Sequence, residues 1–130
     1  MRNLKVKQPK EFMQTLLEII PNDSRISFEG NLKKQLLPKV QFTETEEGCL
    51  IRNTKTPKQD FWVFKIDNES RSYLKNDFIN RIGIATNVIH IMIESEGKLL
   101  FTSYDNFNDD CVLLKETFFA NNNFMEGLIA

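Results

Sequence analysis

The residue types that most often carry catalysis are scarce in this chain. Among its 130 residues there are one histidine, His90, and two cysteines, Cys49 and Cys111. A cysteine nucleophile needs a histidine base beside it and a further acid or amide that orients the base. A lone histidine in a strand is more often a packed or surface side chain. The sequence therefore predicts a structural role for His90 and no enzymatic activity.

The acidic stretch at residues 105–110 suggests a calcium loop by composition alone. Such a loop places oxygen ligands at alternate positions, a glycine at the sixth position and an acid at the twelfth. Counted from Asn106, the sixth position is Cys111 and the twelfth is Thr117, so the motif fails. One histidine and two distant cysteines also lack the spacing of a zinc site. We expect a polar turn here, and no metal or other cofactor in the protein.

Charge is unevenly distributed along the chain. Seventeen Lys and Arg against 18 Asp and Glu give a net charge of −1. Residues 1–66 hold 12 basic and 8 acidic side chains, whereas residues 67–130 hold 5 and 10, so the halves carry +4 and −5. The five glycines are dispersed, which excludes a phosphate-binding glycine loop, and lysines interleaved with aromatics are too few to predict nucleic-acid binding. A charged patch could face a protein partner, and scattered solvated charge is the alternative.

Composition also indicates the compartment. The longest apolar runs are far shorter than the roughly 18 residues of a membrane span, and the N-terminus has charge but no apolar signal segment. Two isolated cysteines favour reduced thiols over a disulfide framework. We expect a cytoplasmic protein that does not bind membranes.

Residues 88–105 predict a β-hairpin, because apolar and polar residues alternate on both sides of a turn at Gly97. Alternation assigns one face to the core, with Ile89, Ile91, Ile93, Leu99 and Phe101. His90 falls on the other face. This hairpin is the longest strand signal in the chain.

Two amphipathic helices are predicted, over residues 9–20 and 69–82. Pro9 suits a first helical turn, and Gly83 suits a position just past a helix end. Further strands are expected at residues 26–29, at 40–42 with 49–52 as a second hairpin, at 60–66 and at 111–114, and a last helix after residues 121–123. The fold class is therefore α+β: a single domain over 1–130 with a mostly antiparallel sheet of five to seven strands and two or three helices, residues 1–8 being flexible.

Several polar residues sit at predicted strand ends and turns where packing does not demand them. We expect Arg52, Asp60 and Arg81 to fix loops through ion pairs or hydrogen bonds to the backbone. The strings that contain these residues and similar ones are ISFEGNL (26–32), RNTKTPKQDF (52–61), RIG (81–83), IHI (89–91), SYDNF (103–107) and DCV (110–112).

In this order the strings resemble small bacterial immunity proteins of polymorphic toxin systems, including contact-dependent growth inhibition, over residues 26–112. The resemblance implies a cytosolic inhibitor that binds a cognate toxin domain, often a nuclease, and that binds no nucleic acid itself. The net charge departs from that of strongly acidic inhibitors of nucleases. The residues that we expect to contact a partner are Tyr104, Asp105, Phe107, Asp109, Asp110, Glu94 and Glu96.

Two alternatives remain open at this point. A small enzyme or ligand-binding domain would use a pocket around His90, with Cys111, Tyr104 and Asp105 brought together by the fold. A structural subunit of a larger assembly would use the same surface patches. The turn at 105–110 is equally compatible with solvated charge above a packed Phe107.

Overall fold

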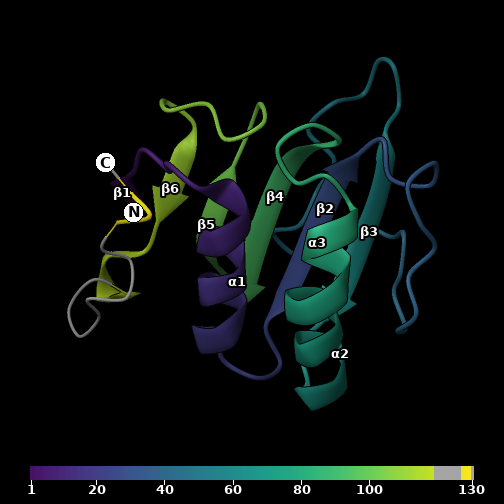
Figure 1. Ribbon diagram of the computed structural model, residues 1–130, viewed down its shortest axis with the longest axis horizontal. Helices are drawn as coiled ribbons and strands as arrows, with labels where there is room; N and C mark the ends of the chain where they lie inside the picture. The colour runs from purple at the N-terminus through teal and green to yellow at the C-terminus, as the bar shows by residue number, and fades with distance from the viewer. Residues whose placement is uncertain (119–126, 130) are drawn as a thin grey trace.

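The computed structural model describes residues 1–118 and 127–129. Six strands form one antiparallel sheet in the order β1-β6-β5-β4-β2-β3, and the helices lie on one of its faces (Figure 1). The strands are β1 (Arg2–Asn3), β2 (Arg25–Gly30), β3 (Asp60–Lys65), β4 (Val88–Ser95), β5 (Lys98–Ser103) and β6 (Val112–Leu114). The predicted α+β class and strand number are confirmed.

The first helix, α1 (Pro9–Ile19), is confirmed at its predicted place. Proline stands in its first turn, where a missing N–H costs nothing because that donor has no partner inside the helix. Its apolar stripe is fully covered, with Phe12, Met13, Leu16 and Leu17 buried. The helix therefore closes one half of the core.

The second predicted helix is one continuous helical segment made of α2 (Asn68–Tyr73), η1 (Leu74–Phe78) and α3 (Ile79–Arg81). Asp67 caps its start by accepting a hydrogen bond from the N–H of Ser70 at 2.8 Å, and the Ser70 hydroxyl accepts from the N–H of Asp67 at 3.0 Å. The middle segment, η1, is a π turn, which the sequence pattern did not indicate. A short 3₁₀ turn, η2 (Glu116–Phe118), ends the first described range.

The main core lies between the helices and the sheet, and it contains Ile91, Ile93 and Phe101 as predicted. Leu99 is a correction, since it packs in a smaller cluster on the opposite face. Ile93 pairs with Phe101 and Glu94 with Leu99, so Leu100 is an extra residue that shifts the alternation of β5. A similar irregularity beside Gly30 leaves Ile89 only half-buried.

The predicted hairpin of residues 40–42 with 49–52 does not form. In residues 40–52 the only backbone bridges are isolated ones, between Glu47 and Leu50 and between Thr43 and Val63 of β3. Residues 43–54, which we call the strap, instead cross the face of the sheet that the helices leave open. Leu50 explains this path, because its side chain is fully buried in the smaller apolar cluster on that face.

The N-terminal residues are more ordered than we predicted. Arg2–Asn3 pairs with β6, and Leu4 is 5% exposed, although we expected residues 1–8 to be flexible. The helix predicted after residues 121–123 lies mostly outside the described residues.

We predict that Ile91→Ala lowers the free energy of unfolding by about 2 to 5 kcal/mol, because it removes buried methyl groups and leaves a cavity. Ile91 is 1% exposed at the centre of the sheet. Urea denaturation measures the change. Leu37→Ala is the control, since Leu37 is 76% exposed, and it should change stability by no more than about 0.5 kcal/mol. Equal stability of the Ile91 variant and the parent would contradict this core.

Candidate functional site

The face of the sheet beneath the strap carries three buried ionisable side chains. Glu29 is 1% exposed, Glu94 5% and His90 6%. Glu29 in β2 lies directly opposite His90 in β4. A buried polar group is costly unless it is hydrogen-bonded, so the partners of these three residues define what the site can do.

Glu29 holds the C-terminal end of the strap. Its two carboxylate oxygens accept hydrogen bonds from the backbone N–H groups of Asn53 and Thr54, at 2.8 and 3.0 Å. Both interactions bridge more than 20 residues of sequence. The carboxylate therefore fixes a loop to the sheet and keeps no oxygen directed at solvent.

His90 is occupied at both ring nitrogens. The N–H of Asp105 donates to Nδ1 at 3.3 Å, and the Thr54 hydroxyl lies 2.8 Å from Nε2. Because Nδ1 accepts, the proton of the neutral ring belongs on Nε2, where it points at the Thr54 oxygen. Tyr104 packs edge-on against the ring at 5.5 Å. His90 thus joins the strap to the turn that follows β5.

Glu94 holds the middle of the strap. Its carboxylate accepts from the N–H of Cys49 at 3.1 Å and lies 3.7 Å from the Arg25 guanidinium. The Cys49 thiol donates to the carbonyl of Gly97 at 3.2 Å. Burial, with the hydrogen bond and charge of Glu94, raises the pKa of Cys49. This thiol is therefore less readily ionised, and less nucleophilic, than a free one.

The turn after β5 has an unusual backbone. Asp105, Asn106 and Phe107 are consecutive residues with φ of 53°, 56° and 61°, a left-handed conformation that costs side-chain-bearing residues energy. The first strand residues of β4 hold it. Asn106 donates from its N–H to the carbonyl of Ile89 at 2.9 Å and from its amide to that of Val88 at 2.8 Å.

The residues of this turn that we expected to contact a partner differ in exposure. Asp105, Asp109 and Asp110 are exposed and Tyr104 is half-buried, but Phe107 is 7% exposed and packs against Phe101. Phe107 therefore belongs to the core and offers no surface in this conformation. Of the predicted partner residues in this turn, only the three aspartates are exposed.

Glu94 and Glu96 lie away from that turn. Glu94 lies near the end of β4 and Glu96 in the connection to β5, whereas the turn follows the end of β5, and the six residues of β5 span about 20 Å. Glu96 is exposed and Glu94 is buried. The sequence suggested one acidic surface, and the fold separates its two parts.

The predicted structural roles of Arg52, Asp60 and Arg81 are confirmed. Arg52 donates to the carbonyl of Gln59 at 2.6 Å, and Arg81 pairs with Asp77 at 2.6 Å. Asp60 accepts from the N–H groups of Leu32 and Lys33 at 3.0 and 2.9 Å. Arg52 and Asp60 therefore fix loops beside β3, whereas the ion pair of Arg81 lies within the second helical segment.

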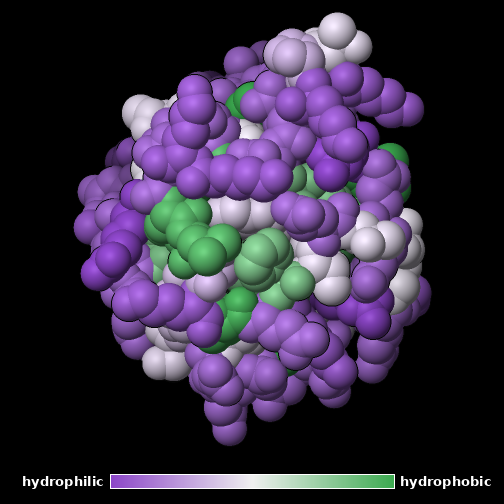
Figure 2. Space-filling view, turned by 90° about the vertical axis from the view of Figure 1, so that its right-hand side faces the viewer, coloured by the Kyte–Doolittle hydropathy of each residue, from purple (hydrophilic) through white to green (hydrophobic). Residues whose placement is uncertain are grey.

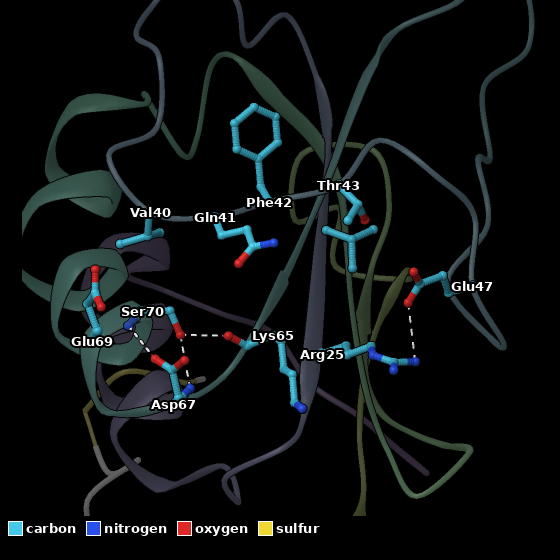
Figure 3. Close-up of a pocket in the computed structure, with 11 residues that line it drawn as sticks. Arg25, Val40, Gln41, Phe42, Thr43, Glu47, Lys65, Asp67, Glu69 and Ser70 are labelled. Atoms are coloured by element: carbon cyan, nitrogen blue, oxygen red, sulfur yellow. Dashed lines mark hydrogen bonds and ion pairs between the residues drawn. The ribbon is translucent and has the colours of Figure 1, made fainter.

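A pocket of about 440 Å³ lies at the outer edge of β3, between residues 40–47 and the start of α2. Figure 3 shows Gln41 and Glu69 on one side of it and Arg25 with Glu47 on the other. Sequence reasoning missed it, because its walls come from segments 25–70 that carry no shared motif. Figure 2 shows apolar side chains gathered within the hydrophilic surface on this side of the molecule. Val40 and Phe42, which line the pocket, are half-buried.

Neither this pocket nor a smaller one of about 220 Å³ is lined by His90. In the described part of the chain, no three His, Cys, Asp or Glu side chains are grouped so as to hold a metal ion. No helix among the described residues has the length and apolarity to cross a bilayer. The chain matches no protein-family model, no curated protein and no solved structure.

We predict that Glu29→Gln loosens the strap. The amide keeps one acceptor oxygen but turns an NH₂ group toward a backbone N–H, and losing a hydrogen bond to a charged group costs about 1.5 to 3 kcal/mol. Unfolding in urea should show this loss, and the amides of Asn53 and Thr54 should exchange with solvent faster. Glu46→Gln, at an exposed strap residue, is the matched control. Unchanged exchange in the Glu29 variant would contradict the anchoring role.

Proposed function

We propose that this protein is an immunity protein, which protects a bacterial cell by binding a cognate toxin domain such as a nuclease and blocking it. The sequence resemblance over residues 26–112 introduces this proposal. One structural observation carries it furthest: the turn after β5 presents three exposed carboxylates on a backbone that the sheet holds in place.

The charge of this turn suits capture of a basic protein. Asp105, Asp109 and Asp110 make no ion pair among the described residues. Their field is therefore not cancelled locally. Complementary charge raises the association rate toward about 10⁸ M⁻¹s⁻¹ at low salt, which suits an inhibitor that must capture its toxin before damage occurs.

The rigidity of the turn supports the same proposal. A loop that is already ordered loses little conformational entropy on binding. Here the Asn106 and His90 contacts hold three left-handed residues, and the Asn3 amide donates to the carbonyl of Asp109 at 3.2 Å. The strain is offset by these contacts, so the carboxylates are positioned before a partner arrives.

The alternative of a small enzyme or ligand-binding domain around His90 has less support. Both ring nitrogens of His90 have partners, which leaves no lone pair for a general base. Among the described residues, the hydrogen-bond partners of His90 are Thr54 and Asp105 and do not include Cys111. The pocket at the β3 edge is the feature that a ligand-binding hypothesis would use instead.

The proposal is tested by co-expression of the protein with the product of its neighbouring gene. We expect that product to arrest growth alone, and the pair to restore growth and to co-purify one to one. If no neighbouring product is toxic or bound, the immunity proposal fails.

The turn is tested in the same system with Asp105→Lys combined with Asp109→Lys. Reversed charge should slow association with the toxin about 10-fold or more at low salt, and the difference should shrink as salt screens it. Stopped-flow binding at several salt concentrations measures this. Glu46→Lys is the control, since Glu46 is also exposed. Equal salt dependence of the double variant and the parent would place the interface elsewhere.

A further inference from the structure

The outer edge of β3 is only partly paired. Val63 exchanges two backbone hydrogen bonds with Thr43 of the strap, at 3.0 and 2.8 Å, so its N–H and carbonyl point away from β2. Backbone groups two residues apart in a strand point the same way. Those of Lys65 therefore point outward too, whereas the next residue, Ile66, donates inward to Ser24 at 2.7 Å.

The pairing that Thr43 begins stops one step later. If the ladder continued, Gln41 would stand opposite Lys65, but only the Thr43 pair forms. The carbonyl of Lys65 is taken by the Ser70 hydroxyl at 2.6 Å. No acceptor in the described residues reaches the N–H of Lys65. One strand position at the sheet edge is thus left with a free backbone donor.

The pocket at the β3 edge occupies this opening. Its volume lies in the range of about 300 to 1,000 Å³ that ligand sites have. Val40 and Phe42 supply its apolar side, and Lys65 lies between Ser70 and Arg25 along its lining (Figure 3). An unpaired strand edge is a ready template for another extended chain.

Charge around the opening favours a basic occupant. Glu69 lines the pocket, is exposed and has no ion pair among the described residues. Each of the two cations in the wall already has an acidic partner: Arg25 pairs with Glu47, which also lines the pocket, at 3.2 Å, and Lys65 pairs with Asp23 at 3.6 Å. A cationic side chain entering beside Glu69 therefore meets an uncompensated carboxylate.

We propose that this opening binds an extended peptide segment of a protein partner, added as a short strand beside β3. A carbonyl of the segment accepts from the N–H of Lys65, its Lys or Arg pairs with Glu69, and an apolar side chain packs against Val40 and Phe42. This mode gives affinity through the main chain and selectivity through side-chain pockets. The inference deepens the proposed function, because it rests on the partner being a protein.

The experiment selects random decapeptides displayed on phage against the purified protein and measures the synthetic, fluorescein-labelled binders by fluorescence polarisation. The paired variants are Lys65→Pro and Lys65→Ala. Both remove the lysine side chain, but only proline removes the N–H, and proline is tolerated where a strand's N–H faces outward. We expect binding about 10-fold weaker for the proline variant, and within about 2-fold of the parent for the alanine variant.

A charge exchange tests the role of Glu69. Selected peptides should be rich in Lys or Arg, and Glu69→Lys should weaken their binding about 3-fold or more. Replacing the peptide's basic residue with Glu should restore binding to this variant. If neither Glu69→Lys nor the replacement of the peptide's basic residue with Glu changes binding, the assignment of Glu69 is wrong.

Several results would overturn the proposal itself. They are the absence of any selected binder, equal binding by the proline and alanine variants, or no shift of the Lys65 amide signal in the ¹⁵N-labelled parent when peptide is added. If the proline variant does not fold, the shift of the Lys65 amide signal tests the proposal on its own. If a folded Lys65→Pro variant binds the toxin with the parent's affinity and rescues growth, this proposal is wrong and the immunity function stands. If peptides bind as expected but no neighbouring gene product is toxic, this proposal stands and the immunity function is wrong.

Discussion

The burial of Glu29 is the constraint on which one side of the molecule depends. A carboxylate taken out of water in the middle of a sheet is unfavourable by several kcal/mol unless donors replace the lost solvent. Its neighbours in β3 and β4 are Phe61 and His90, and the donors that reach it are backbone N–H groups of Asn53 and Thr54. The sheet can bury this residue only if the strap lies across it.

The position of the strap in turn determines the two surfaces discussed above. At one end, Thr54 meets His90, and His90 accepts from the first residue of the acidic turn, Asp105. At the other end, Thr43 pairs with β3 and so sets the place where the pairing opens into a pocket. The acidic turn and the pocket are thus linked through one loop, although they lie at different edges of the sheet.

Patterns of apolar residues predicted the parts of the fold that follow a single period. The helix from Pro9 and the strand around Phe28 are of this kind. Bulges at Ile89 and Leu100 broke the period of two, which moved Leu99 to the other face. The strap and the pocket depend on contacts between residues 20 to 45 apart in sequence, such as Cys49 with Glu94, and no local pattern encodes such contacts. The sequence left Phe107 open between a partner surface and a packed position, because a loop residue and a core residue look alike without tertiary context, and its burial supports the packed position.

The π turn of η1 explains the spacing of the apolar residues in the second helix. Leu74, Phe78 and Ile82 follow one another at intervals of four, and all three are fully buried. In a regular α-helix each interval of four overshoots a full turn by about 40°, so such a stripe would wind around the helix and leave the sheet. The π turn from Leu74 to Phe78 rotates by less than a full turn, and this deficit offsets the excess rotation from Phe78 to Ile82. Local underwinding of the helix therefore keeps this stripe parallel to the helix axis, and the spacing of its apolar side chains is matched to that underwound shape.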